Sequence, residues 1–141
     1  MLKIVVDPGV LISARLSGRG APAELIRSWL DGQIELIVSP YLLGELSEVL
    51  RRPKFRKWLT LKEVEDYVSF LENHALMRPD PPLEHGLTPD PDDDYLVVLA
   101  RSAHANLLVS GDSDLIDLVD PTPPVLTPRR LITLLDELDR P

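Results

Sequence analysis

Carboxylates that end short apolar runs are the residues of this chain best suited to chemistry. The run LKIVVD ends on Asp7, and the run NLLVSGD ends on Asp112, with Asp114 two residues later. Carboxylate oxygens are preferred ligands of hard divalent cations such as Mg²⁺ and Mn²⁺. A cation of this kind lowers the pKa of a bound water molecule and stabilises charge at a phosphodiester. These residues therefore predict a metal site that needs no nucleophilic side chain.

The densest acidic feature is the tract DPDDD at 90–94. Aspartates favour helix N-termini, so capping of the next helix explains part of the tract. One cap needs only one aspartate, however, and four in five positions repel one another. A bound cation would relieve that repulsion, which makes the tract a second source of metal ligands.

Glu45 is a further candidate because of its place in the segment PYLLGELSEVL. Helical spacing puts it at the border of an apolar stripe that includes Leu42 and Val49. A half-buried carboxylate needs a partner or a metal. The alternative is that Glu45 reaches solvent from the edge of the stripe, as Glu48 would.

The other features of the sequence carry weaker signals. The basic segment RRPKFRK at 51–57 supplies Arg51, Arg52 and Lys54 as contacts for a nucleic-acid backbone, although a solvated charged turn is the simpler interpretation. The histidines lack metal-ligand spacing. Asp7 as a turn residue and Asp114 as a helix cap are structural alternatives for those two positions.

Parallel strands would bring these carboxylates together. Apolar runs predict strands at 2–7, 34–38 and 106–110, with weaker ones at 75–79 and 124–127. Apolar periodicity and caps predict helices at 8–16, 21–31, 40–52, 60–73, 92–104, 115–119 and from 128 onward. This alternation indicates an α/β fold, in which a parallel sheet with right-handed crossovers forms the middle of three layers. The ends of neighbouring strands would then meet at one crevice.

Composition limits the classes of protein that the chain can belong to. Its 141 residues suit one domain, 1–141. A net charge of −8 argues against a surface that broadly attracts nucleic acid or anionic membranes, although acidic residues that bind a cation could still attract phosphate. The absence of cysteine excludes disulfides and thiolate metal sites. Apolar runs are too short to cross a bilayer and no secretion signal is evident, so we expect a cytoplasmic protein without a membrane partner.

Taken together, these segments resemble the PIN-domain proteins, in particular the branch of toxins from toxin–antitoxin systems. The resemblance rests on the strand ending at Asp7, on SPYLLGELSEVLRRPKFRKWL, DPDDDYLVVLA and LLVSGDSDLI, and on VLTPRRL. It implies a three-layer α/β/α fold with a central, mostly parallel sheet. It also implies a ribonuclease dependent on Mg²⁺ or Mn²⁺, an RNA substrate, an antitoxin protein as partner and a homodimer.

The resemblance also assigns roles to individual residues. Asp7, Glu45 and Asp112 would be catalytic carboxylates and metal ligands, with Asp114 as a further ligand. Either Asp93 or Asp94 fills the remaining acidic position. Asp94 fits the spacing to Asp112, whereas Asp93 fits the DPDD pattern. Both are candidates for metal ligands, and Asp94 is the candidate for the catalytic role. Ser110 stands where the family often has Thr, and it joins Arg51, Arg52 and Lys54 as a candidate for substrate contacts.

One position departs from the family pattern. The usual opening is Asp-Thr-Asn, whereas this chain has Asp7-Pro8-Gly9. The missing amide would normally help to fix the site by hydrogen bonding, so Gly9 weakens the expectation of activity. The leading hypothesis is therefore a metal-dependent endoribonuclease, and the alternative is a catalytically impaired PIN-like protein that binds RNA or a partner.

Overall fold

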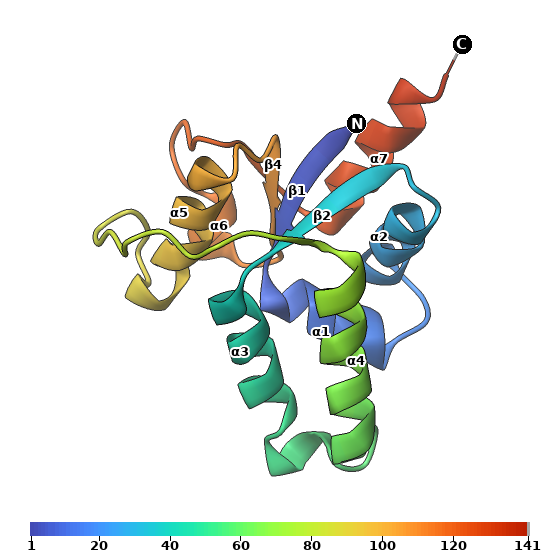
Figure 1. Cartoon of the computed structure of the whole chain (residues 1–141). Coiled ribbons are helices and arrows are strands. Elements are labelled where there is room, and N and C mark those ends of the chain that lie inside the picture. Colours follow the sequence, from blue (N-terminus) through green and yellow to red (C-terminus); the bar gives the residue numbers. More distant parts are fainter. Residues whose placement is uncertain (141) are drawn as a thin grey trace.

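A sheet of five parallel strands forms the centre of the computed structural model, which describes residues 1–140 (Figure 1). The strand order is β3-β2-β1-β4-β5. The strands are β1 (Leu2–Val6), β2 (Ile34–Val38), β3 (Leu76–Met77), β4 (Leu107–Val109) and β5 (Val125–Leu126). The central strands are almost entirely apolar because helices cover both of their faces. The predicted parallel sheet is confirmed, and all five expected strands are present in it.

The two strands that end in candidate carboxylates are neighbours. Val6 of β1 is in register with Val109 of β4. Beyond the last pair, the backbone N–H of Asp7 donates to the carbonyl oxygen of Val109 at 2.9 Å. The strands are parallel, so their carboxyl ends lie at the same edge of the sheet. The expected convergence of these two strand ends is therefore confirmed.

Helices form the two outer layers. They are α1 (Pro8–Leu16), α2 (Ala21–Leu30), α3 (Pro40–Leu50), α4 (Leu61–His74), α5 (Asp94–Ser102), α6 (Ser113–Ile116) and α7 (Pro128–Leu138). Two single-turn 3₁₀ helices, η1 (Pro53–Phe55) and η2 (Pro91–Asp93), complete the described part of the chain.

The order of the strands decides which helices share a layer. The chain moves from β1 through β2 to β3 in one direction, and then returns past β1 to β4 and β5. Right-handed crossovers place helices on opposite faces for the two directions. In agreement with this, α2 packs against α1 and α7, whereas α5 packs on β1 and β4. Figure 1 shows α5 and α6 on one side of the sheet and α2 and α7 on the other.

The predicted helix starts follow from local capping. The Ser39 side chain accepts from the Leu42 N–H at the start of α3, and Thr127 accepts from the Arg130 N–H at the start of α7. Thr60 and Glu63 form the predicted capping box of α4. These caps fix the helix starts locally, and the apolar faces of the helices then pack into a single hydrophobic cluster around the sheet.

Several element boundaries differ from expectation, among them those of α3, α6 and α5, which spans 94–102 instead of 92–104. Helix α3 ends at Leu50 rather than at residue 52, because Arg52 precedes Pro53 and adopts the extended conformation that proline favours before it. The short helix α6 spans 113–116 rather than 115–119, so its cap is Asp112 and not Asp114. No helix in residues 1–140 has the length and apolarity needed to cross a membrane.

Candidate active site

The candidate site lies at the point where the strand order reverses. The chain leaves β1 toward β2 but later returns to place β4 on the other side of β1. Such a switch point opens a crevice beyond the carboxyl ends of the two strands, and this is where open α/β sheets bind ligands. Asp7 follows β1 directly, and Asp112 lies three residues beyond β4. Both carboxylates therefore belong to the crevice.

Ser110 connects these two aspartates. Its hydroxyl donates to Asp7 Oδ2 at 2.8 Å and accepts from the backbone N–H of Asp112 at 3.0 Å. The residue is fully buried. The hydroxyl therefore holds the Asp7 carboxylate in position, and the expected contact of Ser110 with a substrate stays a prediction.

Local backbone donors hold the same carboxylates. Asp7 Oδ1 accepts from the Gly9 N–H at 2.9 Å, which makes Asp7 the cap of α1. Asp112 Oδ1 accepts from the Asp114 N–H at 2.9 Å and caps α6. Each aspartate is thus both a helix cap and a crevice residue, and the caps fix the direction of its carboxylate.

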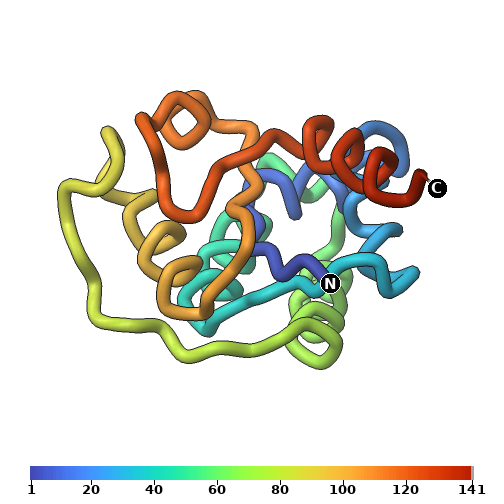
Figure 2. The backbone as a smooth tube through the Cα atoms, turned by 90° about the horizontal axis from the view of Figure 1, so that it is seen from above, coloured from blue at the N-terminus to red at the C-terminus, as the bar shows by residue number. Residues whose placement is uncertain are grey.

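Asp93 and Asp94 point to different regions although they are adjacent. The Asp94 side chain is fully buried and accepts from the Gly86 N–H at 3.1 Å and from the Thr88 N–H and hydroxyl, both at 2.8 Å. This carboxylate anchors the loop that runs along the outside of the molecule between β3 and η2 (Figure 2). Asp93 instead lines the crevice with Asp7 and Asp112. The geometry favours Asp93 over Asp94 as the acidic group at the site.

The environment of Asp93 is unfavourable for a negative charge. Burial, the charges of Asp7, Asp112 and Asp90, and a hydrogen bond to Asp112 together raise its pKa to about 7. Its Oδ2 atom is buried and lacks a hydrogen-bond partner within residues 1–140. A buried carboxylate oxygen without a donor is costly unless a proton or a cation satisfies it.

A second group of carboxylates shares Asp93. Oxygen atoms of Asp90, Asp93 and Asp114 all lie within 4.8 Å of one another, a spacing that one cation can bridge. The predicted ligand Asp114 therefore lies beside Asp93. Sequence reasoning did not single out Asp90, although the acidic density of 90–94 contained the signal.

Glu45 borders the site from α3. It lines a separate hollow with Tyr41, Glu48 and Asp80 rather than the main crevice. Burial raises its pKa, and the charges of Glu48 and Asp92 raise it further. Arg52 opposes this rise, and Asp7 adds to it. Glu45 is therefore close enough to Asp7 to share its electrostatic field, but the two residues line different walls.

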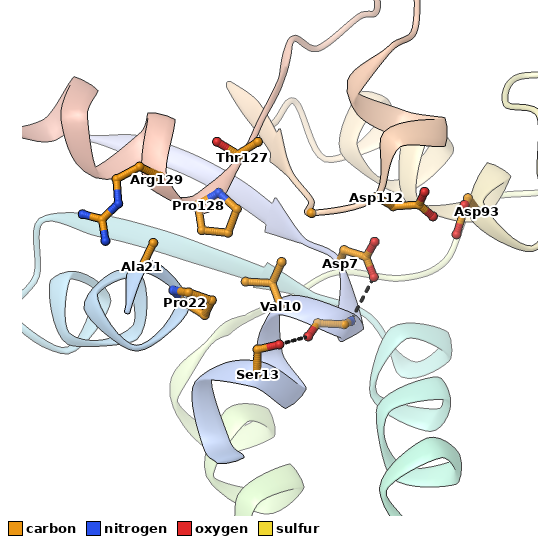
Figure 3. Close-up of a pocket in the computed structure, with 12 residues that line it drawn as sticks. Asp7, Val10, Ser13, Ala21, Pro22, Asp93, Asp112, Thr127, Pro128 and Arg129 are labelled. Carbon is orange, nitrogen blue, oxygen red and sulfur yellow. Dashed lines mark hydrogen bonds between the residues drawn. The ribbon is translucent and has the colours of Figure 1, made fainter. Parts of the chain in front are cut away.

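The main cavity extends well beyond its acidic end. Its volume is about 650 Å³, and the lining residues come from α1 and its cap, α2, η2, the loop after β4, and α7 and its cap. They are Asp7, Gly9, Val10, Ser13, Ala21, Pro22, Asp93, Gly111, Asp112, Thr127, Pro128 and Arg129. Figure 3 shows Asp7, Asp93 and Asp112 at one end and Ala21, Pro22 and Arg129 at the other. Sequence reasoning missed this second end, because its residues lie far apart in the chain.

The basic segment lies apart from this cavity. Arg51, Arg52 and Lys54 are exposed near the turn between α3 and α4, at the end of these helices far from the sheet (Figure 1). Arg51 bonds the Ser47 hydroxyl at 3.0 Å, and Lys54 lies 5.2 Å from the centre of the Phe55 ring. None of the three lines the main cavity.

The crevice suits a divalent cation. Its donors are all oxygen atoms, they come from elements fixed by the sheet and by helix caps, and the unpartnered Oδ2 of Asp93 lacks only a positive charge. This donor set matches Mg²⁺ or Mn²⁺ better than a metal that prefers sulfur or nitrogen. The carboxylate cluster can therefore hold a divalent cation.

Comparisons with known proteins agree with this arrangement. The family model of the PIN domain matches residues 3–114, a range that includes Asp7, Glu45, Asp93 and Asp112. A protein of Methanocaldococcus jannaschii, the uncharacterized MJ1680, is 27% identical over 121 residues, covering 84% of this chain and 76% of that protein.

Two solved structures are similar in fold. PAE2754 from Pyrobaculum aerophilum has a TM-score of 0.65 at 15% identity, covering 96% of this chain and 90% of that one. VapBC2 from Rickettsia felis, solved bound to a DNA fragment from its promoter, has a TM-score of 0.64 at 10% identity, covering 89% of this chain and 98% of that one. At these identities the likeness is one of fold. Because the family model spans most of the sequence and the site lies within it, the chain belongs to the PIN domain family.

Proposed function

We propose that the protein is an endoribonuclease dependent on Mg²⁺ or Mn²⁺, and that Asp7, Asp93 and Asp112 form the core of its metal site. The observation that carries the proposal is the meeting of these carboxylates at one crevice, with Asp93 Oδ2 buried and unpartnered. Asp90 and Asp114 extend the same cluster. Glu45 would act from the edge of the site, and Asp94 would serve the fold.

Each residue would have a distinct part in RNA hydrolysis. Ser110 and the Gly9 N–H would hold the Asp7 carboxylate in one orientation, since they contact its two oxygens. Divalent cations in such a site activate water and neutralise charge at the phosphodiester. The raised pKa of Asp93 fits a group that gives up its proton when a cation binds. Two strand ends and two helix caps would keep these groups in place during the reaction.

The proposal includes an antitoxin partner. It is supported by membership of the PIN domain family and by the similar fold of VapBC2, whose structure was solved as a complex with promoter DNA. As a toxin of such a pair, the protein would act on RNA in the cytoplasm. The resemblance also implies a homodimer.

Metal binding and cleavage in one set of variants test the proposal. Isothermal titration with Mg²⁺ and Mn²⁺, and cleavage of a mixed-sequence RNA, would be measured on the wild type and on the double variant Asp7→Asn with Asp112→Asn. We expect metal binding to be lost and cleavage to fall by roughly 1000-fold or more, because a catalytic metal contributes several kcal/mol. Asp31→Asn, an exposed aspartate at the end of α2, is the matched control.

A second function is favoured by one observation, the exposed Gly9 at the wall of the cavity. Without the amide usual in the family, the protein would bind RNA or a partner without cutting it. Metal binding together with RNA retention but no cleavage, in both Mg²⁺ and Mn²⁺, would support this alternative. Cleavage that disappears in the double variant would exclude it.

The basic segment 51–57 would contact the RNA backbone beyond the site. The side chains of Arg51, Arg52 and Lys54 are exposed in a protein whose net charge is −8, so they provide a local positive surface. Replacing Arg51, Arg52 and Lys54 with Gln would weaken RNA binding at low salt and reduce its salt dependence. Metal binding would remain unchanged, because the segment lies outside the main cavity.

A further inference from the structure

The far end of the main cavity has a chemistry different from that of its acidic end. Val10, Ala21, Pro22 and Pro128 give it apolar walls, and Val10 and Ala21 are buried against the core. In Figure 3 these side chains lie between the aspartates and Arg129. A metal site alone does not require apolar walls, so this end has a separate use.

The size of the cavity indicates what that use is. A volume of about 650 Å³ falls within the range of pockets that bind whole organic ligands, roughly 300–1,000 Å³. One or two cations and a phosphate would occupy only the acidic end. The remaining space adjoins the place where a scissile phosphate would sit, and it is accessible to a group attached to that phosphate.

Polar groups at this end are few and have defined positions. Ser13 is exposed and lines the cavity from α1, and its hydroxyl donates to the Gly9 carbonyl at 3.1 Å, which leaves its oxygen able to accept a hydrogen bond. Arg129 extends from the first turn of α7, where its Nη1 donates to Glu24 at 3.3 Å across the contact between α7 and α2. The Arg129 side chain is more than half exposed, so the remaining N–H groups of its guanidinium can reach a ligand.

We propose that this end of the cavity is a nucleobase subsite, which takes the base of an RNA residue next to the scissile phosphate. The inference rests on the proposed function and adds a determinant of sequence specificity to it. The apolar walls of Val10, Ala21, Pro22 and Pro128 suit the faces of a base, and a small number of polar groups at the rim suit its edge. An arginine offers only donors, and guanine presents two acceptors, O6 and N7, to such a fork. Guanosine is therefore the expected occupant.

Binding of small nucleotides tests the subsite without any RNA cleavage. Guanosine, adenosine, cytidine and uridine 5′-monophosphates would be titrated in the presence of Mg²⁺, with ribose 5-phosphate as the probe that lacks a base. We expect guanosine monophosphate to bind about tenfold more tightly than ribose 5-phosphate, because the base buries apolar surface against the cavity walls. Equal binding of ribose 5-phosphate and all four nucleotides would overturn the proposal.

A variant that fills the far end of the cavity tests whether the nucleotide binds there. Ser13→Phe places a ring in the space between α1 and α7, at an exposed position where the fold does not depend on the serine side chain for packing. It should reduce nucleotide affinity to that of ribose 5-phosphate and leave Mg²⁺ affinity unchanged. Ser69→Phe makes the same change at an exposed position of α4 and should have no effect. Unchanged nucleotide binding in Ser13→Phe would overturn the proposal.

The role of Arg129 requires its own pair of variants. Arg129→Met should remove the preference for guanosine while keeping the common affinity for nucleotides, because the apolar walls remain. Glu24→Gln breaks the same ion pair from the other side and should keep the preference or increase it, since it frees the guanidinium. A wild-type preference for another base, or a guanosine preference that survives in Arg129→Met, would exclude Arg129 as the reading group.

The outcomes separate this inference from the proposed function. Cleavage of a mixed-sequence RNA would be mapped on the same samples. If the protein cleaves RNA without base preference and Ser13→Phe cleaves it equally well, the proposed ribonuclease activity is supported and the subsite is overturned. Base-selective nucleotide binding that is lost in Ser13→Phe, in a protein that cuts no RNA, would support the subsite and contradict the ribonuclease.

Discussion

Two regions meet at the start of α5, the loop before η2 and the crevice, and they give two adjacent aspartates opposite surroundings. On the loop side, Asp94 is fully buried, and three hydrogen bonds from Gly86 and Thr88 satisfy its carboxylate. On the crevice side, Asp93 lies among other carboxylates, and its Oδ2 has no partner within residues 1–140. Two adjacent aspartates therefore differ in the neighbours that the fold gives them.

The difference shows how a structural acid can be distinguished from a functional one. Burial alone does not separate the two residues, since Asp94 is the more buried. Donors separate them, because N–H and hydroxyl groups stabilise the charge on Asp94, whereas carboxylates around Asp93 oppose its charge. An unsatisfied acid surrounded by other acids is the arrangement that a cation stabilises.

Removing the loop-side carboxylate should have the largest effect on stability. We expect Asp94→Ala to lower the free energy of unfolding by about 3 kcal/mol, because three donors lose a charged acceptor. Asp94→Asn should cost less, since its amide oxygen still accepts. Urea unfolding measures both variants. A loss in Asp93→Asn as large as that in Asp94→Ala would remove the distinction between the two regions.

The crevice side should instead appear as a dependence of stability on pH. The pKa of Asp93 is about 7 in the folded protein and near 4 in the unfolded chain, so between these values the folded state binds more protons. Without metal, stability should therefore fall as the pH rises from about 4 to about 7 and then level off.

The size of this effect is expected to be about 1–2 kcal/mol, since Asp93 is partly exposed to solvent. Thermal unfolding in EDTA across this pH range measures it. Asp93→Asn should lack this component, and saturating Mg²⁺ should reverse the loss in the wild type. An Asp93→Asn profile that follows the wild type at every pH would contradict the raised pKa.

The donors on the loop side can be weakened one at a time. Thr88→Val removes a hydroxyl that donates to Asp94 at 2.8 Å, and it should cost about 1 kcal/mol of unfolding free energy. Thr88→Ser keeps the hydroxyl and is the matched control. If Val and Ser are equally stable at this position, the hydroxyl does not contribute to holding the carboxylate.

A donor can also be added on the crevice side. A Cβ atom at Gly9 would lie 3.6 Å from Asp7 Oδ1, an ordinary contact, so Gly9→Asn should change the unfolding free energy by no more than about 0.5 kcal/mol. Its amide would add a hydrogen-bond donor beside the carboxylate cluster. We expect RNA cleavage to rise, with Gly9→Ala as the control that adds the Cβ alone. Equal rates in the Asn and Ala variants would assign no role to the amide.

The sequence by itself determined the elements and the edge of the sheet at which the acids gather. Apolar runs predicted the strands, and caps such as Ser39 and the Thr60–Glu63 pair predicted the helix starts, because these signals act over a few residues. The position of Asp7 and Asp112 followed from a general property of parallel strands. Local chemistry and fold class were sufficient for these predictions.

Only the tertiary structure decided which acid faces the crevice and what surrounds it. Asp93 and Asp94 are neighbours, and the packing of α5 against β1 and β4 decides which of the two side chains faces the crevice. The place of Glu45 on a different wall and the presence of Arg129 at the far end of the cavity depend on how α3 and α7 pack. Spacing along the chain carries no information about such contacts, because side-chain packing between distant segments sets them.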